Sequence, residues 1–129
     1  KIENMLLKFM EANVEFDGNL LLDYLSDQVT YTSQHVAEDL IGKEVVSQYL
    51  IQRYKHFELH QDQQKRSFQK AYATGGSDYN RPCLVISING KKGAYVFLEI
   101  NTNNKITYIQ TLSIPLHSIK IVKKFESEN

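Results

Sequence analysis

The sequence predicts an α+β fold in which helices come first and an antiparallel sheet follows. Near the N terminus, apolar residues recur every three or four positions, which is the spacing of an amphipathic helix. From about residue 56 onward, apolar and polar residues tend instead to alternate, as they do in strands. Asn and Gly residues suited to tight turns separate the later apolar runs. In such a fold the helices cover one face of the sheet.

Size and composition indicate one globular domain. The chain has 129 residues, of which 42% are hydrophobic, and this is enough to bury a single core. Lys and Arg number 15, as do Asp and Glu, so we expect no nucleic-acid or membrane partner. The basic pair Lys65–Arg66 is interpreted as a solvated surface feature. We expect one domain over residues 1–129, with a core from 2 to 114 and an edge extension and tail over 115–129.

The single cysteine, Cys83, excludes an internal disulfide and suits a reducing compartment, so we expect a cytoplasmic protein. It follows Pro82 at the start of an apolar run, which favours a small buried side chain over a catalytic thiol. The sequence begins with Lys1 instead of Met, and a leader or further domain removed before it stays open.

Three helices are predicted in the first half of the chain. The first spans residues 2–15 and has an apolar stripe of Ile2, Met5, Leu6, Phe9, Met10 and Val14. A break at residues 17–19 precedes a shorter helix, whose apolar part is 20–25 and which ends at Asp27. The third begins at Gly42 and has a stripe of Val45, Val46, Tyr49, Leu50 and Tyr54.

Strands are predicted wherever β-branched and aromatic residues alternate with polar ones. They are residues 28–33, 56–60, 67–74, 83–88, 93–100 and 105–113, with 116–122 as an edge extension. Asn89–Gly90 and Asn101–Asn104 are predicted hairpin connections, because Asn and Gly tolerate a positive φ. Residues 75–82 carry the strongest loop signal.

Three local patterns carry a family resemblance. An acidic residue ends the second helix, the first strand reads Val29-Thr-Tyr31, and the third helix begins Gly42-Lys-Glu44. Together with the hairpin from Tyr95 to Leu112, they resemble the nuclear-transport-factor-two-like superfamily, which includes SnoaL-like cyclases, ketosteroid isomerase and non-catalytic binding domains. The resemblance covers roughly residues 2–114. It implies a cystatin-like fold, in which a cone-shaped curved antiparallel sheet and three N-terminal helices enclose an apolar pocket.

The resemblance also permits a test for catalysis. Ketosteroid-isomerase-like proteins carry an Asp base at the end of the first strand, a tyrosine on the first helix and a protonated acid on a late strand. The corresponding positions here fall on Ser33, near Phe9 and near Val96. None of these side chains supplies the required acid or base near neutral pH. The sequence therefore favours a domain without this mechanism.

We interpret the chain as a small-ligand-binding domain with an apolar pocket, without catalysis and without a cofactor. The expected ligand is a small apolar or polar-edged molecule, since tyrosine hydroxyls near the pocket need partners. The predicted pocket lining consists of Phe9, Tyr31, Ser33, Tyr49 and Val96.

Two alternatives stay open. One is an isomerase-, dehydratase- or cyclase-type enzyme that uses Tyr31, His35 or Glu38 as an acid or base. The other is a protein-interaction module that uses the face of the sheet and has little pocket. A deep cavity with a titratable group would favour the enzyme, whereas an exposed aromatic sheet face would favour the interaction module.

His56-x-Glu58-x-His60 is the nearest approach to a metal motif. On a strand these three side chains would share one face, which could bring two imidazoles and a carboxylate together. Phe57 and Leu59 would then occupy the opposite face, so we interpret the triplet as the wet outer face of an edge strand. We predict no metal site.

The strand over residues 93–100 has two unlike faces, and neither is polar. Ala94, Val96, Leu98 and Ile100 form an aliphatic face, and Tyr95, Phe97 and Glu99 form the other. A sheet with one side in water would show a polar face, so both faces are expected to be covered. We therefore predict a homodimer with Tyr95 and Phe97 in its interface.

Overall fold

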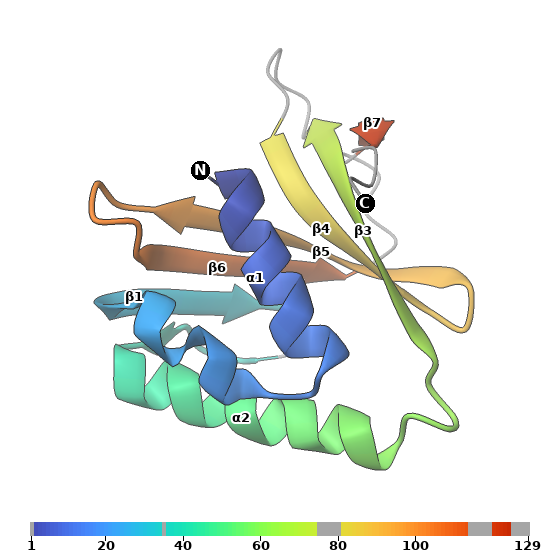
Figure 1. Ribbon diagram of the computed structural model, residues 1–129, viewed down its shortest axis with the longest axis horizontal. Coiled ribbons are helices and arrows are strands. Elements are labelled where there is room, and N and C mark those ends of the chain that lie inside the picture. Colours follow the sequence, from blue (N-terminus) through green and yellow to red (C-terminus); the bar gives the residue numbers. More distant parts are fainter. Residues whose placement is uncertain (1, 35, 75–80, 114–119, 125–129) are drawn as a thin grey trace.

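A computed structural model describes residues 2–34, 36–74, 81–113 and 120–124, and it confirms the α+β fold (Figure 1). The helical elements are α1 (Ile2–Val14), the 3-10 helix η1 (Gly18–Tyr24) and α2 (Lys43–Leu59). The strands are β1 (Leu25–Ser33), β2 (Leu40–Ile41), β3 (Arg66–Thr74), β4 (Arg81–Ile88), β5 (Lys91–Ile100), β6 (Ile106–Ser113) and β7 (Lys120–Lys124). In Figure 1, α1 lies across one face of the curved sheet and α2 runs beside β1.

The described strands form one sheet with the order β2-β1-β6-β5-β4-β3-β7. All neighbouring pairs are antiparallel except β1 and β6, which run parallel. The predicted antiparallel sheet is confirmed as the main arrangement, and the parallel β1–β6 pair is a feature that the sequence did not indicate. Turn signals in a sequence report only hairpins between consecutive strands, whereas a parallel pair needs a long connection. Here that connection contains α2 and the four strands β2, β3, β4 and β5.

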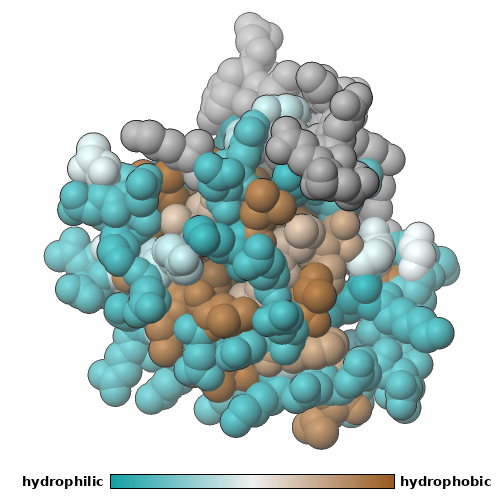
Figure 2. Space-filling model, in the orientation of Figure 1, coloured by the Kyte–Doolittle hydropathy of each residue, from teal (hydrophilic) through white to brown (hydrophobic). Residues whose placement is uncertain are grey.

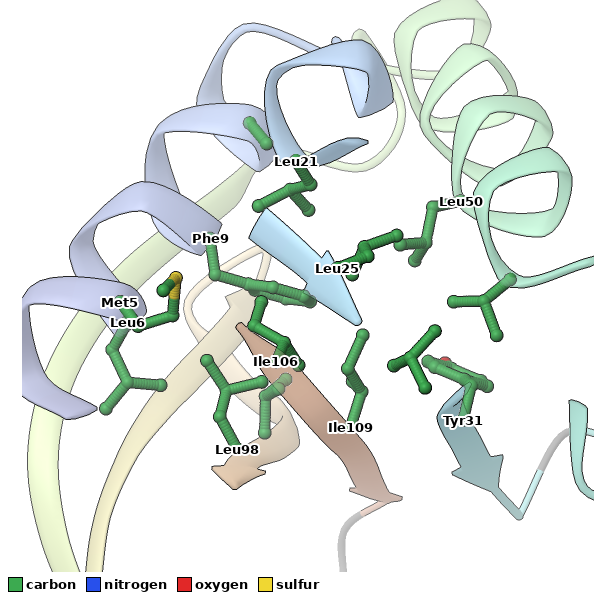
Figure 3. Packing of buried hydrophobic residues seen from close by; sticks show 14 of the residues in the cluster. Met5, Leu6, Phe9, Leu21, Leu25, Tyr31, Leu50, Leu98, Ile106 and Ile109 are labelled. Carbon is green, nitrogen blue, oxygen red and sulfur yellow. The ribbon is translucent and has the colours of Figure 1, made fainter. Parts of the chain in front are cut away.

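The main core lies between the helices and the concave face of the sheet. Phe9 from α1, Leu50 from α2 and Tyr31 from β1 converge there (Figure 3). The predicted stripe of α1 is confirmed for Met5, Leu6 and Phe9, which are buried. Val14 departs from the stripe and is 53% exposed, because it is the last residue of the helix. The molecular surface seen in the orientation of Figure 1 is mostly hydrophilic, with apolar areas between the polar side chains (Figure 2).

The third helix is longer than the sequence indicated. Residues 56–59 belong to α2, so the strand predicted over 56–60 is absent from the structure. The alternation of Phe57 and Leu59 was misleading, since Leu59 is 80% exposed and only Phe57 packs against the core. Leu50, Tyr54 and Phe57 follow each other at helical spacing, and all three side chains pack into the main core.

Turn residues lie where positive φ angles are needed. Asn89 (φ 53°) and Gly90 (φ 82°) connect β4 to β5, and Asn104 (φ 58°) lies between β5 and β6, which confirms both predicted connections. Gly42 (φ 102°) joins the β1–β2 region to α2, and its N–H donates to the carbonyl of Val29 at 2.8 Å. A residue with a Cβ is strained at such a φ, which explains glycine at this helix start.

A second cluster covers the convex face of the sheet. It contains Ala71, Cys83, Val85, Tyr95 and Phe97. Cys83 is the small buried side chain that was predicted, and burial raises the pKa of its thiol to about 11, which disfavours the reactive thiolate. Tyr95 and Phe97 are only 5% and 4% exposed in the single chain, so they present little surface to a second copy. The homodimer stays a prediction.

Within the part of the chain that the structure describes, no helix has the length and apolarity needed to cross a membrane. The tail predicted over 115–129 falls largely outside the described residues, although β7 forms the edge next to β3.

Candidate functional site

A cavity of about 280 Å³ lies between the helices and the concave face of the sheet. The five residues that the sequence placed around a pocket are all in its wall, namely Phe9, Tyr31, Ser33, Tyr49 and Val96. The strand register accounts for part of this convergence. Ser33 lies opposite Thr111, and Thr111 lies opposite Val96, so these three side chains form one row on the concave face.

Much of the wall is apolar. Phe9 and Leu50 contribute from the helices, and Ile86, Ile88, Ala94 and Val96 contribute from β4 and β5. The β4–β5 register places Ile86 opposite Ala94, so the hairpin presents a continuous aliphatic surface to the cavity. An apolar wall of this kind favours the transfer of an apolar ligand from water.

Three tyrosines place polar groups in this apolar wall. The rings of Tyr31 and Tyr49 are 4.8 Å apart between centroids and are tilted by 44° to each other. Burial and then the neighbouring Tyr31 raise the pKa of Tyr49 to about 12. Burial and Tyr31 also raise the pKa of Tyr54 well above its ordinary value. Both phenols are therefore neutral near pH 7, where they serve as hydrogen-bond donors and not as bases.

Asn13 connects the C-terminal end of α1 to α2 and β3, and it is only 2% exposed. Its Nδ2 donates to the carbonyl of Phe9 at 2.9 Å and to the Tyr54 hydroxyl at 3.0 Å. Arg66 Nη1 donates to Asn13 Oδ1 at 3.0 Å, and Nη2 donates to the Asn13 carbonyl at 2.8 Å. One buried amide thus fixes a phenol and a guanidinium in the wall of the cavity.

Two guanidinium groups share the ring of Phe57. The Cζ of Arg66 lies 4.1 Å from the ring centroid, and the Cζ of Arg53 lies 4.7 Å from it. Burial lowers the pKa of Arg66 to about 10, with Tyr54 acting in the opposite direction and Arg53 adding to the decrease. Arg66 still carries its charge at neutral pH. Its interpretation as a solvated surface residue was therefore wrong, since Arg66 is half-buried and lines the cavity.

The side chains named as acids or bases for the enzyme alternative do not all lie in the described cavity wall. No Asp or Glu is among the described residues that line the cavity. Glu38 is exposed and outside this wall, and His35 lies outside the described residues. His56 does line the cavity, and it was missed because its segment was predicted to be a strand on the outer face.

The geometry assumed for the metal motif does not occur. His56 and Glu58 are on α2, where positions two apart do not share a face, and His60 caps that helix. The His56 and His60 rings approach to 4.4 Å between centroids. Among residues 2–34, 36–74, 81–113 and 120–124, no group of three or more His, Cys, Asp or Glu side chains is arranged to hold a metal ion.

The raised pKa of Tyr49 predicts a specific loss of stability in alkali. An unfolded tyrosine titrates near pH 10, whereas folded Tyr49 titrates at about 12, so its contribution is complete below pH 10 and is lost between pH 10 and 12. Urea unfolding of the wild type and of Tyr49→Phe at pH 9 and at pH 11.5 measures this contribution. We expect the stability difference to shift in favour of Tyr49→Phe at the higher pH. An unchanged difference would contradict the burial of this phenol.

Comparisons with protein-family models and with curated proteins give no match. Solved structures do match over most of the chain. A SnoaL-like protein of unknown function from Burkholderia thailandensis has a TM-score of 0.62 and 14% identity, over 88% of this chain and 95% of that chain. A steroid delta-isomerase from Pseudomonas aeruginosa has a TM-score of 0.59 and 15% identity, over 91% of this chain and 82% of that chain.

A third match is a nuclear-transport-factor-two-like protein of unknown function from Cytophaga hutchinsonii. It has a TM-score of 0.56 and 16% identity, over 89% of this chain and 91% of that chain. The chain therefore has the fold of the SnoaL-like and nuclear-transport-factor-two-like proteins, as its sequence pattern indicated. Because proteins of this fold have different activities, function has to be argued from the cavity.

Proposed function

We propose that this protein is a binding domain that holds one small, largely apolar molecule in the cavity and does not transform it. The observation that supports this most directly is the composition of the wall. Aliphatic and aromatic side chains form most of it, and the phenols of Tyr31, Tyr49 and Tyr54 add a few directed hydrogen-bond donors. This combination is typical of small-molecule sites. The volume of about 280 Å³ is just below the range of about 300 to 1,000 Å³ that is typical of such sites.

Apart from His56, the polar groups of the described wall are poorly suited to acid–base chemistry. Ser33 stands where the resemblance would place a carboxylate base, and its cavity neighbours in the strand row are Thr111 and Val96. Neutral phenols and protonated guanidiniums do not accept a proton near neutral pH. These groups therefore include no base that could remove a carbon-bound proton.

A second candidate function is an isomerase- or cyclase-type enzyme, and the grouping of Tyr31, Tyr49 and Tyr54 favours it. Phenol donors aimed at one oxygen can stabilise a developing oxyanion. In this case His56 would be the proton acceptor, since it is the imidazole in the described part of the wall. Turnover by the wild type that His56→Ala abolishes, with ligand affinity retained, would favour the enzyme over the binding domain.

Filling the cavity should weaken ligand binding. Ala94→Leu adds three carbons to a residue of the cavity wall, and the matched control Ala37→Leu makes the same change at an exposed position outside it. The probe is naphthylmethanol, a neutral molecule with an apolar body and one hydroxyl, and calorimetry or ligand-observed NMR measures its affinity. We expect Ala94→Leu to weaken binding by about tenfold or more and Ala37→Leu to leave it unchanged. Equal affinity in the wild type and Ala94→Leu would contradict the proposal.

A further inference from the structure

The arginines that line the cavity have no acidic counterpart in its described wall. Arg53 and Arg66 both line it, and none of the described lining residues is an Asp or Glu. In the described part of the chain, neither guanidinium forms an ion pair with a carboxylate. Two like charges that share the Phe57 ring repel each other, and a half-buried cation loses part of its hydration. An anion placed near both groups would offset each of these costs.

The two arginines differ in how much the protein itself compensates them. Arg66 donates two hydrogen bonds to Asn13, one of them to a carbonyl in the last turn of α1, where the helix dipole favours a cation. The rings of Phe16 and Phe68 lie 5.1 and 5.2 Å from its Cζ. These contacts account for a structural role of Arg66. They do not explain why an arginine is present at position 53, because the described ring contact of Arg53 is Phe57 alone.

The contacts of Arg66 also hold it in place. Two of its five N–H donors are used by Asn13, and these two bonds orient the guanidinium plane. Arg53, on α2, lies against the same Phe57 ring as Arg66, so a fixed and a less constrained cation both line the cavity. Guanidinium groups bind a carboxylate through paired N–H donors more strongly than a neutral acceptor.

We infer that the ligand is a small amphipathic carboxylate, with its acid group bound by Arg53 and Arg66 and its apolar body against the aliphatic wall. This inference rests on the proposed function and names the ligand class for the same cavity. Asn13 is then a positioning residue for Arg66. The phenols of Tyr49 and Tyr54 are further neutral donors within the same wall.

Matched acids and alcohols test the inference. The probes are hexanoate with hexanol, octanoate with octanol, and naphthoate with naphthylmethanol, so that each pair shares one apolar body. Affinities are measured by calorimetry for the wild type, Arg53→Gln, the control Lys55→Gln and the filled cavity of Ala94→Leu. Lys55 is exposed on the same helix and outside the cavity wall, so its replacement changes the net charge equally.

We expect the wild type to bind at least one acid about tenfold more tightly than its alcohol, as charge-assisted hydrogen bonds would give. Arg53→Gln should remove most of this preference, whereas Lys55→Gln should keep it. If acid and alcohol bind equally and Ala94→Leu weakens both, the inference is overturned and the proposed function stands. An undiminished preference in Arg53→Gln also overturns it. If no pair binds, both are overturned.

Discussion

Asn13→Leu should lower the free energy of unfolding by about 3 kcal/mol. The substitution keeps the size and branching of the side chain but removes the Nδ2 donor to Tyr54 and the Oδ1 acceptor for Arg66. A neutral hydrogen bond is worth about 1 kcal/mol net and one to a charged group about 1.5 to 3, with part of the loss offset by the apolar side chain. Urea unfolding followed by circular dichroism measures the change.

Asn4→Leu provides the control, because it makes the same substitution on an exposed position of the same helix. Its effect should stay within about 0.5 kcal/mol, as for most surface changes. If Asn13→Leu proves as stable as Asn4→Leu, then Asn13 does not hold α1, α2 and β3 together as the structure indicates.

Ile109→Ala should cost about 2 to 5 kcal/mol of unfolding free energy. Ile109 is fully buried on β6, which lies between β1 and β5 in the sheet, and it lies opposite Tyr31 of β1. Truncating an isoleucine there loses the transfer free energy of the removed carbons and leaves a cavity in a close-packed core. Thermal and urea unfolding should both show the loss.

Ile41→Ala tests the same truncation on the other side of β1. Ile41 lies on the short edge strand β2 opposite Thr30 and is 66% exposed. We expect a change of no more than about 0.5 kcal/mol. Equal losses from Ile41→Ala and Ile109→Ala would place the core elsewhere than between the helices and the concave face.

Local patterns in the sequence were sufficient to predict the elements that carry the aromatic wall. Alternation in the first strand placed Tyr31 and Ser33 on one face, and the helical stripe placed Tyr49 near them. Both patterns are local consequences of strand and helix periodicity. The wall residues Phe9 and Val96 followed from the family resemblance, which the fold supports.

The cationic side of the cavity was not predictable in the same way. Arg66 bonds to Asn13, which is 53 positions away in the chain, and no local pattern reports such a partner. Its neighbour Lys65 made it look like part of a surface pair. A usable signal was present in the alternation of Arg66 with Phe68 at the start of β3, because the register places Phe68 opposite Ile86 of the cavity wall.

Long-range pairing and helix length account for the remaining differences. The parallel contact of β1 with β6 joins Tyr31 to Ile109, which are far apart in the sequence and connected by no turn. The end of α2 was missed because a short alternating run satisfied a strand pattern as well as a helical one. Packing of Phe57 against Arg66 selects the helix, and this contact becomes visible only in three dimensions.

The most direct test of the central claim is a methyl NMR titration of the wild type with naphthoate. Val96 and Val85 are the same residue type on neighbouring strands, but Val96 lines the cavity and Val85 lies in the cluster on the convex face. We predict saturable shift changes for the methyl groups of Val96, Ala94 and Ile86, with those of Val85 unmoved. Saturable changes at Val85 without changes at Val96 would contradict a ligand site in this cavity.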